Sequence, residues 1–218
     1  ADFTRSHITT WGLNQVVFTD SNLTEVRFSH SDVTGANFIN ATVLRTDFQT
    51  VQNFKTVTVN NLAGVVLKGL DLTGMDLSGR NLKGANLQET KLNGVNFEGA
   101  SLKGIAGAKA VHDGGHSAEL GRQCGLSSML MRDGGWEAKE MKVAGWTAKE
   151  MKSGGYTAAE MRAGGSTAKD MKPGGYTAKD MISGGYNTKE LRADGWSYSY
   201  ERGIGGVKQQ NGYWYNES

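Results

Sequence analysis

The chain has little of several features that would assign it to common protein classes. Its 218 residues include one proline, Pro173, and one cysteine, Cys124. A single cysteine excludes an internal disulfide framework. No apolar run approaches the ~20 residues that a membrane-spanning helix requires. The 24 basic and 22 acidic residues also leave the chain without the basic excess that is typical of a nucleic-acid-binding domain.

Glycine, in contrast, is abundant, with 31 residues in the chain, or about twice its usual share of ~7%. Disordered low-complexity chains are usually rich in both glycine and proline, whereas repeat proteins place glycine at fixed turns. The composition therefore directs attention to internal repeats.

The first half of the chain has an apolar residue at every fifth position. One run comprises Phe3, Ile8, Leu13, Phe18, Leu23, Phe28, Val33, Phe38, Val43 and Phe48. A second run, one residue out of phase, comprises Val57, Leu62, Leu67, Leu72, Leu77, Leu82, Leu87, Leu92, Phe97 and Leu102. We place the phase slip in an irregular turn at 49–56. A period of five fits neither the 3.6 of a helix nor the 2 of a strand, and it predicts a chain that turns a corner every five residues.

These residues resemble the pentapeptide-repeat family, whose pattern is A-(D/N)-L-x-x. Clear copies begin at Ala36, Met75, Ala85 and Val95. The resemblance covers 1–107 and implies a right-handed, four-sided β-helix of about five coils. The central Leu and Phe side chains are then its core, and the regular positions carry no chemistry.

The second half repeats every ten residues, over 108–196. Glycine recurs from Gly115 to Gly195, and the next residue is usually a tryptophan or tyrosine. A methionine or leucine follows six places after each glycine from Gly125 to Gly185. Thr147-x-x-Glu150 and its equivalents have the form of a helix capping box. The pattern predicts short capped helices joined by glycine turns, and it resembles decapeptide arrays of algal, protist and phage proteins. Because Met and the aromatic residue lie five positions apart, a variant β-helix is the alternative.

No set of residues with the form of a catalytic or cofactor site stands out, so we expect no enzyme and no cofactor. His112, His116 and Cys124 could be part of a metal site, but no further cysteine or acidic cluster completes a four-ligand set, and we expect no metal. The aromatic ladder from Trp136 to Tyr186 could stack bases. The lysines of the same repeats alternate with acidic residues, which favours packing of the aromatic residues between units over nucleic-acid binding.

The segment 197–218 breaks both periods and is rich in aromatic residues. The aromatic candidates here and just before it are Trp196, Tyr198, Tyr200, Tyr213, Trp214 and Tyr215. One interpretation is a cap over the last repeat, because terminal repeats must be closed off. The other is a segment that docks on another protein, because Tyr and Trp are enriched at interfaces.

The sequence therefore predicts a non-enzymatic structural, linker or docking subunit whose partners are other proteins of a larger assembly. The decapeptide resemblance and the start at Ala1 rather than methionine lead us to expect a processed protein of an algal plastid. Its place there would be in the thylakoid lumen, peripheral to a photosystem-associated membrane complex. The first alternative is a topoisomerase-binding DNA mimic. Such proteins need a strongly negative surface, yet 1–107 holds nine basic and nine acidic residues. The second is an adaptor secreted by a pathogen or phage.

Overall fold

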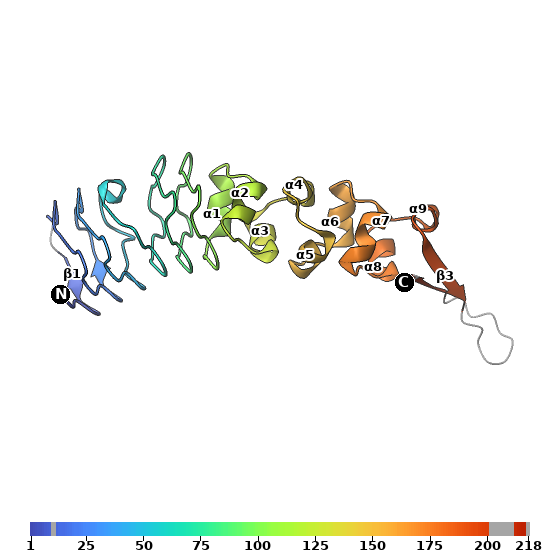
Figure 1. Ribbon diagram of the computed structural model, residues 1–218, viewed down its shortest axis with the longest axis horizontal. Coiled ribbons are helices and arrows are strands. Elements are labelled where there is room, and N and C mark those ends of the chain that lie inside the picture. Colours follow the sequence, from blue (N-terminus) through green and yellow to red (C-terminus); the bar gives the residue numbers. More distant parts are fainter. Residues whose placement is uncertain (10–11, 201–211, 217–218) are drawn as a thin grey trace. The chain divides into compact units, whose positions relative to one another are not determined.

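The computed structural model describes residues 1–9, 12–200 and 212–216. It divides into two compact units, Ala1–Gly135 and Trp136–Ser218, and each is described by itself. Figure 1 shows that the first unit begins with narrow coils and ends in short helices, and that the second consists mainly of short helices.

The first unit is built from coils of 20 residues. Parallel bridges join residues 20 apart, as in Asp2↔Asn22, Asn22↔Thr42 and Val66↔Asn86. The longest such pairing is that of strand β1 (His7–Ile8) with β2 (Arg27–Phe28). Because each coil holds four pentapeptides, this segment is the four-sided β-helix that the five-residue period predicts.

From Leu13 onward the central residues of the pentapeptides point into the coil and most are buried, whereas Phe3 and Ile8 at the start of the chain are half-buried. Leu72, Leu77 and Leu87 have no exposed surface. Residues 20 apart stack on one another, so the phenylalanines form two interleaved columns. The rings of Phe18 and Phe38 lie 5.1 Å apart and are stacked, and those of Phe28 and Phe48 lie 5.0 Å apart. Each fully buried Leu or Phe contributes roughly 1.5–3 kcal/mol, so the columns hold the coils together.

Where Asp or Asn precedes the central residue, its side chain shapes the corner. Oδ1 of Asp76 accepts the backbone N–H of Ser78 at 3.0 Å, and Oδ1 of Asn86 accepts that of Gln88 at 3.0 Å. Such local turns are the usual role of Asx side chains. The second position of the motif is therefore structural.

The phase slip has two parts. Bridges are offset by 20 residues at Asp32↔Gln52, by 21 at Asn37↔Thr58 and by 19 at Asp47↔Val66. The extra residue lies in the 3-10 helix η1 (Phe54–Thr56), inside the expected irregular turn. The compensating shortening follows after Thr58.

As a result, the sequence pattern assigns one central position to the wrong residue. Thr58 pairs with Asn37, so Val59, which is 5% exposed, occupies the position equivalent to Phe38. Val57 corresponds instead to Ala36, two places earlier. The five-residue spacing misassigned Val57 because an insertion before it and a deletion after it leave a net shift of only one residue.

Helices replace the coils from Ala108 onward. The first unit contains α1 (Ala108–Asp113), α2 (Ala118–Gln123) and α3 (Ser128–Gly134), with α1 packed on α3. The backbone N–H of Leu102, in the last coil, donates to the carbonyl of Cys124 at 2.7 Å. The secondary structure thus changes at 107–108, whereas the compact unit continues to Gly135.

The second unit is a series of short helices. They are α4 (Ala138–Val143), α5 (Ala148–Ser153), α6 (Ala158–Ala163), α7 (Ala168–Met171), α8 (Ala178–Ser183) and α9 (Thr188–Ala193), with a 3-10 turn η2 (Lys172–Gly174) after α7. Alternate helices stack in two columns, one of α4, α6 and α8 and the other of α5, α7 and α9. The helical prediction is confirmed, and the variant β-helix is excluded for this array.

Capping boxes and glycines define each helix. The Thr157 hydroxyl accepts the N–H of Glu160, and the Glu160 carboxylate accepts the N–H of Thr157 at 2.6 Å. Gly185 has a φ of +86°, which only glycine adopts without strain. A Cβ on Gly184 would lie 2.7 Å from the carbonyl carbon of Ala158, so the glycine before the turn allows the stacked backbones to approach closely.

A β-hairpin follows α9. Strands β3 (Trp196–Tyr200) and β4 (Gly212–Asn216) pair antiparallel. Across the residues that the structure describes, none of the helices has the length and hydropathy needed to cross a bilayer.

We expect Leu77→Asp to unfold the β-helix, because it places an unpaired charge in a column with no exposed surface. The cost should exceed ~3 kcal/mol. Lys83 is exposed, and Lys83→Ala should change stability by no more than ~0.5 kcal/mol. Thermal unfolding followed by circular dichroism compares the two variants. An unchanged melting temperature for Leu77→Asp would contradict the assignment of the core.

Acid should weaken the helical array. The pKa of Asp180 is lowered first because the carboxylate accepts the N–H of Thr177, and further by Lys152. A lowered folded-state pKa stabilises the fold above the unfolded value of ~3.9, and this contribution is lost as pH falls through the folded value. The helical melting temperature should therefore be flat above about pH 5 and fall below about pH 4. Asp180→Asn should melt lower at neutral pH and respond less to acid; equal acid sensitivity in both proteins would contradict this origin.

Candidate docking surfaces

Two residues of the candidate metal site, His116 and Cys124, are engaged in packing, and the third, His112, lies 3.5 Å from the Asp113 carboxylate. An imidazole nitrogen of His116 lies 2.9 Å from the carbonyl oxygen of Leu92, and its ring contacts Phe97. Cys124 is buried and its thiol donates to the carbonyl of Phe97, and burial raises the pKa of that thiol. Among the described residues, no group of three or more His, Cys, Asp or Glu side chains is arranged to hold a metal ion.

Most of the aromatic ladder of the second unit is part of the core, as the sequence indicates, and only Trp146 within it is half-buried. Tyr156, Tyr176 and Tyr186 are no more than 5% exposed. Each tyrosine hydroxyl donates to the backbone carbonyl 20 residues earlier, at 2.7 Å for Tyr156 to Trp136 and 2.6 Å for Tyr176 to Tyr156. Burial raises the pKa of Tyr186 to about 12. These rings join successive coils and present no face on which bases could stack.

Cations that follow the buried methionines link helices of different columns. Lys142 pairs with Asp170 at 2.9 Å and Lys152 with Asp180 at 3.3 Å. Both also donate to the carbonyl of the glycine 23 residues later, Gly165 and Gly175 respectively. A cation near the C-terminus of a helix is usually explained by the dipole of its own helix. The structure shows that they instead reach across to the repeats that follow.

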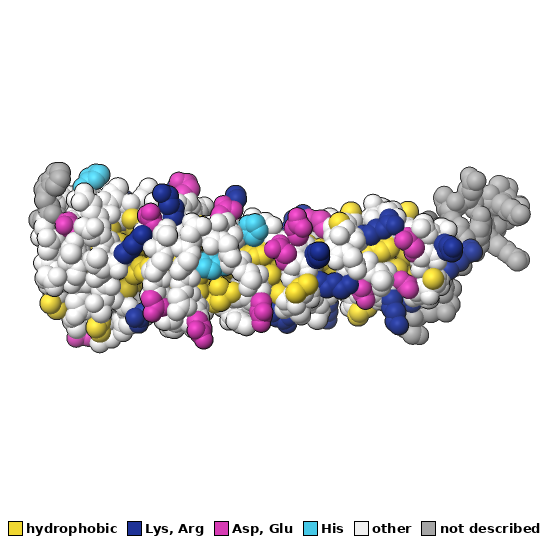
Figure 2. All heavy atoms as spheres, turned by 90° about the horizontal axis from the view of Figure 1, so that it is seen from above, with side chains coloured by type: hydrophobic (Ala, Val, Ile, Leu, Met, Phe, Trp, Pro, Cys, Tyr) yellow, Lys and Arg dark blue, Asp and Glu magenta, His cyan; other side chains and the backbone are white. Residues whose placement is uncertain are grey.

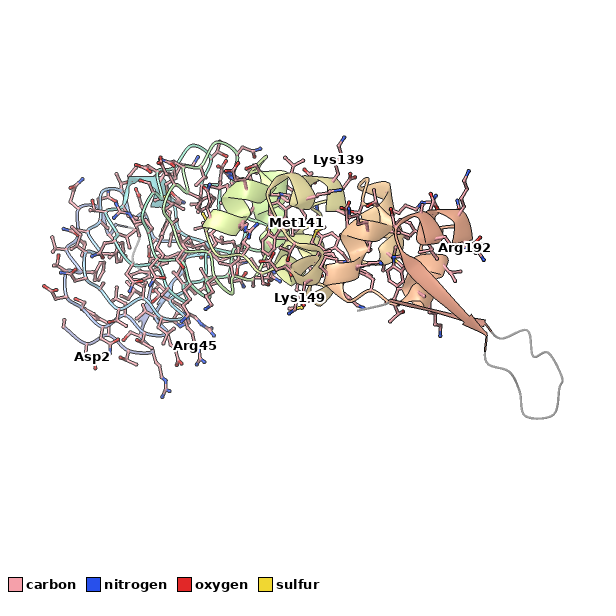
Figure 3. The ribbon with its side chains drawn as sticks, turned by 45° about the vertical axis from the view of Figure 1, so that its right-hand side comes forward. Asp2, Arg45, Lys139, Met141, Lys149 and Arg192 are labelled. Carbon is pink, nitrogen blue, oxygen red and sulfur yellow. The ribbon has the colours of Figure 1, made fainter. Side chains whose placement is uncertain are left out.

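A second set of lysines has no such role. These lysines occupy the second helical position of their repeats, and they are exposed: Lys139, Lys149, Lys169, Lys179 and Lys189. Lys139 and Lys149 come from different columns, and Figure 3 shows them projecting in opposite directions while Met141 points inward. The sequence showed only that these lysines alternate with acidic residues. Their spacing of 20 within a column was visible, but it gains meaning only when the coil length is known.

A charged hollow on the first coils was also missed. It has a volume of about 480 Å³ and includes Arg5, Glu25 and Arg45 in its lining. Glu25 pairs with Arg5 at 2.8 Å and with Arg45 at 3.2 Å, and these contacts hold the pKa of its carboxyl below the usual value. The three residues lie 20 apart on successive coils. They therefore form an ion-pair ladder along the rod.

A groove opens on the column of α4, α6 and α8. Its lining includes Tyr156, Ala159, Tyr176, Ser183 and Gly184, and its volume is about 480 Å³. Ala159 stands where the repeats before and after it have lysine. The groove therefore lies at the one interruption of that column's lysine pattern.

The aromatic candidates at the end of the chain fall into two groups. Trp196 is 3% exposed, and its indole N–H donates to the carbonyl of Ala168 at 3.2 Å. The ammonium group of Lys172 lies 5.8 Å from the Trp196 ring centre. Trp196 thus continues the aromatic ladder and is covered rather than available to a partner.

The other five candidates lie in the hairpin. Its backbone register pairs Tyr198 with Trp214, Ser197 with Tyr215 and Ser199 with Tyr213, and Tyr200 pairs with Gly212. The fold brings both aromatic stretches together although 201–211 separate them in sequence.

Charges of both signs are interspersed over the surface. Figure 2 shows Lys and Arg side chains among Asp and Glu side chains on the face in view. The nine basic and nine acidic residues of 1–107 do not form the strongly negative rod that a DNA mimic requires.

Of three solved structures that resemble the chain, two are described as pentapeptide-repeat proteins. HetL, involved in heterocyst differentiation regulation in the cyanobacterium Nostoc sp. strain PCC 7120, is 23% identical, with a TM-score of 0.19 over 49% of this chain and 46% of HetL. A thylakoid-lumen protein of Arabidopsis thaliana is 21% identical, with a TM-score of 0.20 over 48% of this chain and 63% of that protein. QnrB1, a plasmid-mediated fluoroquinolone resistance protein, is 16% identical, with a TM-score of 0.21 over 48% of this chain and 57% of QnrB1. The chain spans less than two thirds of each, and no curated protein matches it.

The two periods of the chain match two repeat families. Residues 13–50, 61–99 and 81–104 match pentapeptide repeats, and residues 106–176 match the decapeptide repeat region. The chain therefore contains a pentapeptide-repeat segment, residues 13–104, followed by a decapeptide-repeat region, residues 106–176.

Proposed function

We propose that this protein is a non-enzymatic structural or docking subunit of a larger protein assembly. The observation that supports this most directly is that the recurrent residues of both repeats pack inside the coils or cap the helices. Most of the central Leu and Phe, the buried Met and most of the aromatic ladder pack inside the coils. The capping acids bond to helix ends. The outward positions are therefore the part of each repeat that is free to recognise a partner.

The hairpin is our first docking segment. Trp196 closes the aromatic ladder from within, as a terminal cap does. We assign the docking role to Tyr198, Tyr200, Tyr213, Trp214 and Tyr215, because the strand register gathers them in one short hairpin. Aromatic anchors often dominate binding, with truncations that cost ~2 kcal/mol or more.

For the assembly itself, we propose a photosystem-associated complex of an algal plastid, with the protein in the thylakoid lumen and peripheral to the membrane. The resemblance of the second array to algal decapeptides supports this. A secreted adaptor would use the same surfaces in another location. Fractionation of the source cells separates the two, because the proposal requires the chain to co-purify with thylakoid membranes.

Removing the hairpin should separate docking from capping. We expect deletion of 203–218 to release the protein from its native complex, because the aromatic anchors are lost, while the helical melting temperature changes little. Trp196→Ala should do the opposite and destabilise the array by about 3 kcal/mol or more, because it empties a buried position. Native gels of cell extracts and thermal unfolding of the purified variants are the two measurements.

The outcomes distinguish the roles of the tail. If deletion of 203–218 melts the helical array, the whole tail is a cap and the docking assignment is wrong. If the intact chain migrates alone in native extracts, the proposal of an assembly subunit is wrong as well.

A further inference from the structure

The decapeptide array carries a straight row of exposed lysines on one of its two columns. Lys149, Lys169 and Lys189 occupy the second position of α5, α7 and α9. These helices stack directly on one another. Residues 20 apart are equivalent in this stack, so the three side chains follow one line along the array. We call this set the lysine row.

The position of these lysines is not explained by stability. The first turn of a helix has a partial positive charge that favours acidic side chains and disfavours cations. In these helices the acidic residue at the third position supplies the stabilising contact at the helix N-terminus, because Glu150, Asp170 and Glu190 all complete capping boxes. A lysine beside each of them runs against that preference three times. Repeated violations of a local rule are expected where a surface serves recognition.

The carboxylates near the row accept backbone N–H groups, and two of them also pair with cations outside the row. Asp170 accepts the N–H of Thr167 and pairs with Lys142, and Glu190 accepts the N–H of Asn187 and pairs with Arg162. Asp194 accepts the backbone N–H of Lys169 at 2.9 Å. The lysine ammonium groups instead end flexible four-carbon stems, and each of the three side chains is exposed. The outermost charges along this line are therefore positive, although the signs are nearly balanced in the sequence.

The spacing of the row indicates what fits it. Packed helices lie about 8–10 Å apart, so successive ammonium groups recur at about that interval. On an α-helix, side chains seven residues apart lie on one face, and a rise of 1.5 Å per residue separates them by about 10.5 Å. Glutamates at i, i+7 and i+14 of a helix laid along the array would each meet one lysine. Tyr156, Tyr176 and Tyr186 are 5% exposed or less, so these rings offer no stacking surface for a nucleic acid.

We propose that the lysine row docks an acidic α-helix of a partner protein, with carboxylates at seven-residue spacing. This deepens the proposed function by naming the chemistry of one partner, and it rests on that function. The neighbouring column has a broken row. It carries Lys139 and Lys179 but has Ala159 between them, so it offers only two of the three contacts.

The test uses the full-length protein and two synthetic helical peptides of equal composition. One peptide has glutamates at i, i+7 and i+14, and in the other the same glutamates are moved to different sides of the helix. Three exposed ion pairs are worth only ~0.2–1 kcal/mol each. Binding should therefore be weak, weaken further with added salt, and favour the regularly spaced peptide by about 10-fold.

Matched variants locate the site. Lys149→Gln with Lys169→Gln should abolish the preference for the spaced peptide. Lys139→Gln with Lys179→Gln removes the same charge from the same helical position and should leave the preference unchanged. Ala159→Lys completes the second row, and titration should then give two peptides per chain instead of one. Circular dichroism melting confirms that each variant remains folded.

Several results would overturn the proposal. Equal binding of both peptides, or equal loss in both double variants, would mean general charge attraction. Tighter binding to anionic phospholipid vesicles or duplex DNA through the same lysines would assign the row to a membrane or a nucleic acid. If neither peptide binds while the chain still co-migrates with its native complex, the lysine-row proposal is wrong and the assembly role stands. If the chain also migrates alone, both are wrong.

Discussion

The hydrogen bonds between successive coils, in which equivalent residues lie 20 apart, are the constraint on which the rest of the structure depends. In the β-helix they run from strand to strand, as from the N–H of Leu77 to the carbonyl of Asn96 at 2.9 Å. In the helical array the tyrosine hydroxyls also connect successive coils, by donating to carbonyls 20 residues earlier. Four pentapeptides and two decapeptides both complete one such coil. Every side chain is thereby assigned to a column, and columns rather than linear motifs are the units in which this protein can present a surface.

This division separates inner positions from outer ones. The inner columns carry the stability, because Leu, Phe, Met and the aromatic rings are buried there. The outer columns differ from side to side. One face of the β-helix has the Arg5–Glu25–Arg45 ladder, whereas the helical array has a continuous lysine row on one column and an interrupted one on the other. Repeats that look alike in sequence therefore produce faces that are chemically distinct.

Much of the fold could be predicted from the sequence because its coils and helices follow short, regular sequence repeats. The five-residue spacing of Leu and Phe and the Thr-x-x-Glu boxes predicted coils and short helices, and both are present. The insertion and deletion around Val57 and Val59 could not be resolved, since two opposite shifts of register nearly cancel in a spacing pattern. The cross-column partners of Lys142 and Lys152 were also missed. An ion pair over 28 residues has no local signal and appears only when the coil length places the two side chains together.

The candidate site was less accessible to sequence reasoning than the fold. The aromatic tail could be recognised because it breaks the repeats. The sequence did not, however, separate Trp196, which is buried, from the aromatic residues that follow it. The lysine row was overlooked for the opposite reason, because it conforms to the repeat. A docking surface that recurs in every second repeat resembles ordinary patterning until the two columns are known.

Chemical cross-linking of the endogenous protein in intact cells, read by mass spectrometry, tests the central claim most directly. A carbodiimide joins lysine amines directly to carboxylates, so it reports on contacts between the exposed lysines of the array and acidic side chains without altering the sequence. The account predicts links from Lys149, Lys169 and Lys189 to acidic segments of one recurring partner protein, with fewer from Lys139 and Lys179. Links confined to this chain, or scattered over unrelated proteins in proportion to their abundance, would contradict a role as a docking subunit.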